Sequence, residues 1–202
     1  MKRLFVIVAL CAVAASTHAA SSNERIKIGG EGKVAFVNAC NAPTEALVTA
    51  ANKIGNMLMI NIEVTKGTWK LAEAQKCIDA TGANAAVFVV KDEMLPLSLV
   101  SLEAKWGVVN AAGLDGKSIE KETLRVATMI LGGAASKYSA SSMRPVFSKE
   151  DLAKKAGDIV TFDSIIAISS YLPELGIKPY RMMTRDDAIE EGLIKADDAA
   201  KK

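Results

Sequence analysis

Residues 121–138 constrain the fold of this chain more than any other stretch. Apolar or small side chains fill nearly every position after Glu122, among them Leu124, Ile130 and Leu131. A helix that is apolar on all sides belongs in the interior of a domain. The sequence therefore predicts a central buried helix, with a sheet formed by the segments before it and helical cover formed by the segments after it.

Strand-like and helix-like patterns alternate before this stretch. Strands are expected at residues 33–40, 59–65 and 84–90, and helices at residues 43–58 and 68–81. Such alternation is typical of a parallel sheet with right-handed crossovers. Two adjacent strand-like runs, at residues 97–104 and 106–112, predict an antiparallel hairpin. The predicted fold class is α/β, with a mixed, mainly parallel sheet, an antiparallel edge hairpin, helices packed on the faces and a helical C-terminal part.

Residues 1–20 have the pattern of a secretory signal peptide. Lys2 and Arg3 precede an apolar run, and small residues follow at a cleavage site after Ala19 or Ala20. We therefore expect a protein that is secreted or periplasmic. The remaining chain is predicted to begin with a flexible arm or opening hairpin at residues 21–32. A single α/β domain follows at residues 33–196, and a frayed tail at residues 197–202.

Removal of the signal peptide changes the charge and leaves no histidine. The 25 basic residues lose Lys2 and Arg3, which leaves 23 against 23 acidic residues, and the only histidine, His18, is also lost. A neutral surface gives no electrostatic basis for binding nucleic acid or an anionic membrane. No later segment is apolar enough over sufficient length to insert into a membrane. The absence of histidine excludes Ser-His-Asp and Cys-His catalysis.

Two cysteines, Cys40 and Cys77, remain after the signal peptide. In an exported protein such a pair predicts a disulfide. The bridge would close a loop of about 38 residues and would stabilise the fold by roughly 4 kcal/mol on the chain-entropy model. The alternative is a pair of buried free thiols, since each cysteine follows an apolar or helical stretch.

Two glycines, a methionine and a strand carry a resemblance to a known family. Gly132 and Gly133 interrupt the apolar stretch, Met143 follows them, and residues 106–110 form a candidate edge strand. In this order, over residues 33–150, the chain resembles the metzincin metallopeptidases and most of all the archaemetzincins. The resemblance implies an active-site helix with two zinc-binding His and a Glu, a glycine turn to a third His, a Met-containing turn beneath the metal and an edge strand that lines the substrate cleft.

The zinc-binding side chains of that family are absent here. If Gly133 is the turning glycine, the general-base position falls on Ala127 and the ligand positions fall on Val126, Ile130 and Ser136. If Gly132 is the turning glycine, the ligand positions fall on Arg125, Met129 and Ala135. Zinc requires three protein ligands and an open position for water. We therefore predict no metal and no cofactor, and interpret the chain as a pseudopeptidase.

The predicted function is binding of an extended peptide, as part of a polypeptide or glycoprotein, along the edge strand. The candidate surface consists of Trp106, Val108, Asn110, Tyr138 and Met143. One alternative is a His-independent hydrolase, an aspartic-type acid peptidase that acts on extracellular protein or glycoprotein through Asp163. A second alternative is a structural envelope protein.

Overall fold

The computed structural model describes residues 24–155 and 157–195. The predicted signal peptide and frayed tail lie outside the described residues. Contacts divide the chain into two units, and the larger one begins at Lys27 and ends at Met182. The described part of the smaller unit consists of residues 24–26 and 183–195. The single domain that the sequence predicts covers residues 33–196. No helix in the described ranges has the length and apolar character needed to cross a membrane.

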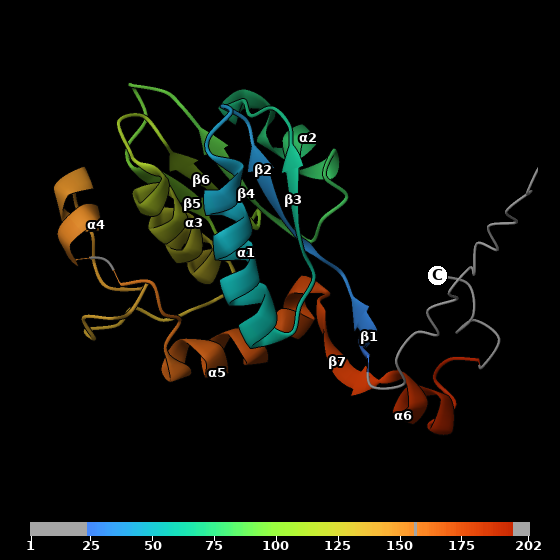
Figure 1. The fold of residues 1–202 in the computed structure, drawn as a ribbon. Helices are drawn as coiled ribbons and strands as arrows, with labels where there is room; N and C mark the ends of the chain where they lie inside the picture. The colour runs from blue at the N-terminus through green and yellow to red at the C-terminus, as the bar shows by residue number, and fades with distance from the viewer. Residues whose placement is uncertain (1–23, 156, 196–202) are drawn as a thin grey trace, which may run out of the picture. The chain divides into compact units, whose positions relative to one another are not determined.

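A five-stranded sheet forms the centre of the larger unit (Figure 1). Its strands lie in the order β3 (Ile62–Lys66), β2 (Val34–Asn38), β4 (Ala85–Val90), β6 (Trp106–Asn110) and β5 (Ser98–Ser101). All neighbouring pairs are parallel except β5 and β6, which are antiparallel. The mixed, mainly parallel sheet with an antiparallel edge hairpin is therefore confirmed. β2 and β4 are buried along their whole length, as expected for apolar strands covered on both faces.

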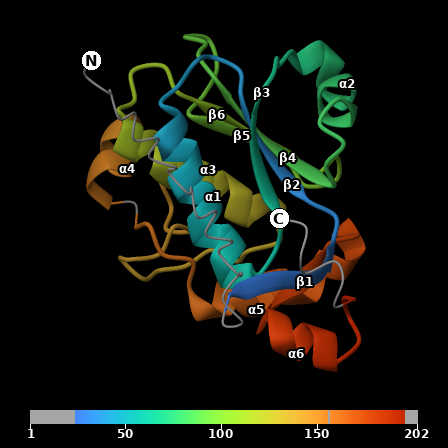
Figure 2. The same ribbon diagram turned by 45° about the vertical axis from the view of Figure 1, so that its right-hand side comes forward.

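Helices cover both faces of this sheet (Figures 1 and 2). α1 (Thr44–Leu58) and α3 (Gly116–Ile130) pack on one face, over a core that contains Phe36. The opposite face carries α2 (Ala74–Asp79), which packs on a smaller core around Phe88. The alternation of side chains along each strand supplies both cores, because successive residues point to opposite faces.

The central helix α3 is buried as predicted, but it is shorter than predicted. It ends at Ile130, and Gly132 follows in the left-handed conformation, with φ of 88°. The N–H groups of Gly132 and Gly133 donate to the carbonyl oxygens of Met129, at 2.9 Å, and Thr128, at 2.8 Å. This pair of hydrogen bonds is a Schellman motif, which terminates a helix. The prediction that the helix extends to residue 138 is therefore wrong.

The helical C-terminal part is also confirmed. After α3 come α4 (Lys149–Lys155), α5 (Phe162–Tyr171) and a 3-10 turn (Leu172–Leu175), and a shorter 3-10 turn (Leu71–Glu73) precedes α2. The smaller unit contains α6 (Arg185–Glu190), whose N-cap Thr184 accepts a hydrogen bond from the N–H of Asp187 at 3.2 Å.

A second, two-stranded sheet joins segments from the two ends of the chain. β1 (Arg25–Glu31) pairs with β7 (Lys178–Thr184). An ion pair between Lys178 and Glu31, at 2.7 Å, links these strands. The region predicted as a flexible arm or opening hairpin therefore contains a strand whose partner is distant in sequence. No pattern in the sequence indicated β7.

The predicted disulfide between Cys40 and Cys77 is not formed, and both thiols are free. Cys40 packs against the core beneath α1 and α3, whereas Cys77 packs against the core beneath α2. The central sheet lies between these two cores. A disulfide requires the two Cα atoms to lie within about 7 Å of each other, with side chains that face one another. The alternative of two free, partly buried thiols describes the structure.

Candidate functional site along α3 and β5

The edge strand beside α3 is β5, not β6. The prediction that residues 106–110 form the edge is wrong, because β6 lies between β4 and β5 and pairs with both. Val108 and Asn110 are consequently buried, with exposed fractions of 1% and 2%. Their backbone groups are already committed to the sheet. A peptide that adds to this end of the sheet would contact β5.

Asn110 and Trp106 have structural partners of their own. The Asn110 carboxamide donates to the carbonyl oxygens of Asp92, at 2.5 Å, and Leu95, at 2.8 Å, and so fixes the loop before β5. Trp106 lies against Trp69, with ring centroids 5.0 Å apart, on the sheet face that carries α2. The Asn110 and Trp106 side chains therefore contribute to folding rather than to an open surface beside α3.

The other predicted site residues follow the central helix. Tyr138 is exposed, whereas Met143 is buried and its carbonyl oxygen accepts a hydrogen bond from the N–H of Ser136 at 3.2 Å. Asp163 is an exposed carboxylate in the first turn of α5. Acidic residues are stabilising at this position because the helix N-terminus carries partial positive charge.

The structure distinguishes the two alignments of the family's zinc-binding positions. Val126 and Ile130 are fully buried and face β6, where both side chains approach Gly107. Arg125 and Met129 instead lie on the partly exposed stripe of α3. This stripe faces β5, because Arg125 contacts Ser98. With Gly132 as the turning residue, the first two ligand positions therefore fall on the accessible side of the helix.

A salt bridge occupies this side of α3. The Arg125 Nε donates to one carboxylate oxygen of Glu122 at 2.8 Å, and Nη2 donates to the other. Nη2 also donates to Ser98 Oγ at 2.9 Å, and Nη1 lies 3.5 Å from Met129 Sδ. The Glu122 side chain is fully buried, and that of Arg125 is 14% exposed. Sequence reasoning missed this pair, although its i,i+3 spacing on a helix is the pattern that brings opposite charges together.

These residues do not fit a zinc ion. Arginine cannot lose its proton in a protein and donates without accepting, so Arg125 excludes a cation from the first ligand position. Met129 offers only a weakly coordinating thioether, and Ala135 has no ligand atom. Across the described ranges, no group of three or more His, Cys, Asp or Glu side chains is arranged to hold a metal.

Solved structures, but no sequence comparison, show a likeness to known proteins. No protein-family model matches the sequence, and no curated protein matches it. The structure is similar to that of a zinc-dependent peptidase from Methanocorpusculum labreanum, with a TM-score of 0.53, 8% identity and coverage of 67% of this chain and 99% of that one. It is also similar to archaemetzincin from Methanopyrus kandleri, with a TM-score of 0.56, 9% identity and coverage of 71% and 96%. At such low identity the likeness shows an archaemetzincin-like fold and no more.

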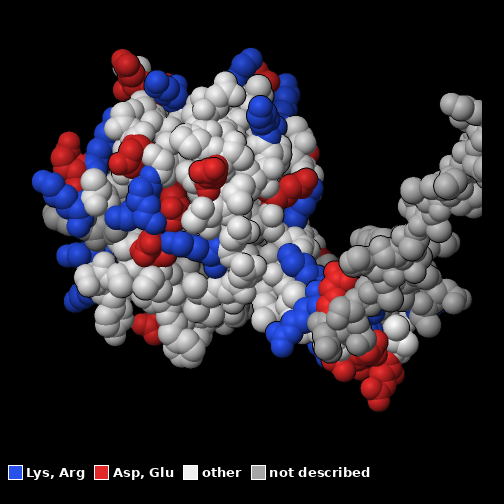
Figure 3. Space-filling model, in the orientation of Figure 1, with Lys and Arg blue, Asp and Glu red and all other residues white. Residues whose placement is uncertain are grey.

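Four charged side chains join the N-terminal turn of α3 to its neighbours. Lys53 on α1 contacts Glu120 at 2.9 Å and Asp158 at 2.8 Å, and Lys117 contacts the same carboxylates at 3.0 and 3.3 Å. Basic and acidic side chains are likewise interspersed over the face shown in Figure 3. Burial opposes the charge on Glu120, but hydrogen bonds from Lys53 and Lys117 lower its pKa. The hydrogen bond from Lys53 is the main reason that the pKa of Asp158 is also lowered.

This network predicts a loss of stability in acid. The carboxyl groups of Glu120 and Asp158 have pKa values below their ordinary values of 4.5 and 3.8, so protonation favours the unfolded chain. The contribution is complete above the ordinary values and falls as the pH drops through the folded ones. Between about pH 6 and pH 3, we expect the free energy of unfolding of Asp158→Asn to fall by about 0.5–1 kcal/mol less than that of the wild type. The difference is small because the partly exposed ion pairs are screened by solvent.

Urea denaturation at several pH values measures this difference. Glu103→Gln removes an exposed carboxylate in the turn between β5 and β6, outside the network, and it should leave the pH dependence closer to that of the wild type. An equal flattening of the pH dependence in both variants would contradict a specific contribution from the network.

Proposed function

We propose that this chain is an exported, non-catalytic protein with a metzincin-like fold that binds an extended polypeptide by main-chain pairing along β5. The observation that carries the proposal is the position of β5, which is the outer strand of the sheet beside α3. In the family that the sequence resembles, a strand in this position lines the substrate cleft. Export is supported by the signal-peptide pattern of residues 1–20.

The backbone of β5 offers hydrogen-bonding groups on its outer side. The N–H of Asn110 donates to the carbonyl oxygen of Leu97 at 2.9 Å. Because hydrogen-bonded positions alternate along an antiparallel pair, Leu99 and Ser101 direct their backbone groups to β6. Ser98 and Val100 direct theirs outward. Outward N–H and C=O groups on an edge strand are the groups with which an extended peptide pairs.

Binding without cleavage is supported by the residues of α3. The salt bridge between Arg125 and Glu122 is a neutral pair at the level of β5, where it contacts Ser98. Neither partner can activate a water molecule in this arrangement, since Arg125 does not deprotonate and the Glu122 carboxylate is committed to it. The same contact holds β5 against α3, which presents a fixed strand to a ligand.

Substitution of Val100 by Pro tests the pairing. Proline removes the outward N–H, and its ring obstructs an incoming strand, yet it is tolerated where the N–H faces solvent. The probe is a peptide selected against the wild-type protein from a library of random decapeptides displayed on phage. We expect Val100→Pro to weaken its binding at least about tenfold, and the matched control Val100→Thr to change it less than about threefold.

Amide hydrogen exchange gives an independent measurement. Bound peptide should slow exchange at Ser98 and Val100, the two outward amides, more than at Leu99 and Ser101, which β6 already protects. Failure to select any peptide, or equal binding of the peptide to Val100→Pro, would contradict the pairing. Cleavage of the selected peptide by the wild-type protein would contradict the non-catalytic part of the proposal.

A further inference from the structure

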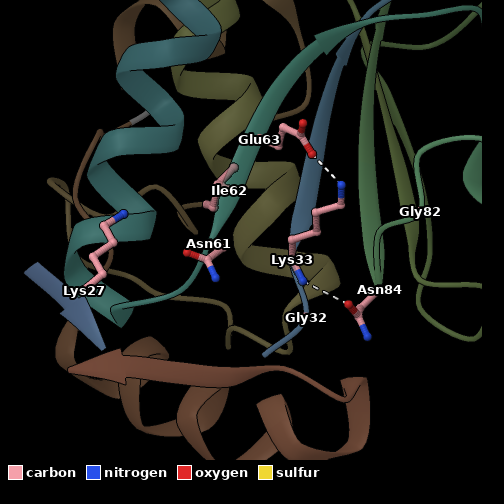
Figure 4. Close-up of a pocket in the computed structure, with 8 residues that line it drawn as sticks. All are labelled: Lys27, Gly32, Lys33, Asn61, Ile62, Glu63, Gly82 and Asn84. Carbon is pink, nitrogen blue, oxygen red and sulfur yellow. Dashed lines mark hydrogen bonds and ion pairs between the residues drawn. The ribbon is translucent and has the colours of Figure 1, made fainter. Parts of the chain in front are cut away.

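A pocket of about 500 Å³ opens at the start of the parallel strands, beside the other edge of the sheet (Figure 4). Its polar lining comes from separate segments: Lys27 from β1, Lys33 from just before β2, Asn61 from just before β3, Glu63 from β3, and Asn84 from the loop before β4. The volume lies within the range of about 300–1,000 Å³ that is usual for small-molecule sites. Because β3 and β5 are opposite edges of the sheet, this pocket is separate from the proposed peptide site.

The walls of the pocket are richer in hydrogen-bond donors than in acceptors. Lys33 and Lys27 contribute two ammonium groups against the single carboxylate of Glu63. The backbone N–H of Lys33 donates to Asn84 Oδ1 at 2.9 Å, which orients the carboxamide. Within the part of the chain that the structure describes, the Asn84 Nδ2 group then makes only one long contact, 3.4 Å, to the carbonyl oxygen of Gly176. Its donor capacity is therefore incompletely used.

Two further side chains in the pocket lack polar partners. Lys27 Nζ lies 4.4 Å from the centre of the Tyr180 ring and has no acidic partner among residues 24–155 and 157–195. Within the same ranges, the Asn61 carboxamide makes no hydrogen bond within the protein. In Figure 4, Lys27 and Asn61 lie on one side of Lys33, and Asn84 lies on the other. A ligand between them would meet donors from both sides.

We propose that this pocket binds a small organic oxyanion, a molecule whose carboxylate or phosphate groups accept hydrogen bonds from Lys27, Lys33, Asn61 and Asn84. Lys33 already holds one oxyanion, the Glu63 carboxylate, at 2.5 Å. The Glu63 side chain is 55% exposed, so it can move into water when a ligand replaces it. Glu63 therefore acts as a competitor that occupies the site in the absence of ligand.

Isothermal titration calorimetry with three probes tests this inference. Citrate carries carboxylates, glucose 6-phosphate carries a phosphate, and glucose carries neither. We expect citrate, glucose 6-phosphate or both to bind with a Kd below about 1 mM, and glucose not to bind. Binding of citrate alone assigns a carboxylate ligand, and binding of glucose 6-phosphate alone assigns a phosphate ligand. Absence of binding by both anions would overturn the proposal.

Variants distinguish specific binding in the pocket from nonspecific attraction of an anion to positive charge. The double variant Lys27→Gln/Lys33→Gln should weaken binding at least about tenfold, and Asn61→Leu should weaken it about threefold without a change in net charge. Glu63→Gln should strengthen binding about threefold, because the competing carboxylate is removed. The double variant Lys70→Gln/Lys137→Gln changes the net charge equally at exposed lysines outside the pocket, and it should leave binding unchanged.

A second measurement locates the ligand. Titration of the wild-type protein with the binding anion should shift the backbone amide resonances of Gly32 and Gly82, which line the pocket, in nuclear magnetic resonance spectra. Equal weakening in the lysine control, or shifts that omit both glycines, would overturn the assignment.

Discussion

Substitution of Glu122 by Leu is expected to lower the free energy of unfolding by about 3–5 kcal/mol, because it leaves the Arg125 charge largely buried without its partner. The Arg125 side chain is 14% exposed, and its two strongest hydrogen bonds are to the Glu122 carboxylate. Ser98 Oγ and Met129 Sδ, the other contacts, carry no compensating charge. Urea denaturation followed by circular dichroism measures the effect.

A double substitution distinguishes the cost of an unpaired buried charge from the cost of removing both charges. Glu122→Leu/Arg125→Leu removes both charges, and it should recover most of the stability lost in Glu122→Leu, because replacement of a buried ion pair by apolar side chains is often close to neutral. The matched control is Glu73→Leu, which breaks an i,i+3 pair with Lys70 whose side chains are 71% and 46% exposed. That change should cost less than about 1 kcal/mol. Equal costs for Glu73→Leu and Glu122→Leu would contradict the role given to burial.

Substitution of Gly107 by Ala is expected to destabilise the fold by about 1–3 kcal/mol through overpacking. Gly107 is the second residue of β6, and a Cβ atom there would overlap Val126 Cγ1 and approach Ile130 Cγ2 at 3.4 Å. Val126 cannot easily turn aside, because a β-branched side chain in a helix has one strongly preferred rotamer. α3 would have to move away from the sheet.

Removal of the obstructing methyl groups tests this explanation. Gly107→Ala/Val126→Ala should be more stable than the sum of the two single effects predicts, by about 1 kcal/mol, because the new methyl group fills space that Val126 vacates. Gly116→Ala is the matched control at the start of α3, where the nearest neighbour of the added Cβ atom, Pro43 Cγ, lies at 3.9 Å. Thermal denaturation should show little loss for this control. Additive behaviour in the double variant would contradict a steric clash between these two positions.

Local sequence patterns predicted the interior of this fold well. β2 is apolar up to Asn38 and β4 is apolar throughout, and short runs of this kind, flanked by helical segments, are typical of parallel strands buried on both faces. The end of α3 was harder, because alanine and leucine remain good helix formers after Ile130, and only the conformation of Gly132 decides where the helix stops. Helix propensity therefore remains high after Ile130, although the backbone leaves the helix there.

Long-range pairing could not be predicted from the same patterns. The hairpin of β5 and β6 was expected, but local alternation does not reveal which of two paired strands lies outermost. β1 and β7 pair across almost the whole length of the chain, and neither contains a continuous apolar run. The prediction of the candidate site depended on the same long-range pairing. The central helix was identified correctly, but the outer strand beside it is β5 rather than β6, so the surface that we propose differs from the one expected from the sequence.

If the chain is exported, as we propose, the separation of Cys40 and Cys77 by the central sheet has a consequence for its maturation. While the polypeptide is unfolded, nothing holds these thiols apart, and an oxidant could join them into a covalent loop. That loop would oppose the placement of β2 and α2, because each thiol has to reach a different side of the sheet. In an oxidising compartment the chain must therefore fold before its thiols are oxidised. Molecules that are oxidised before they fold would carry this crosslink, and a non-reducing gel would separate them from correctly folded molecules.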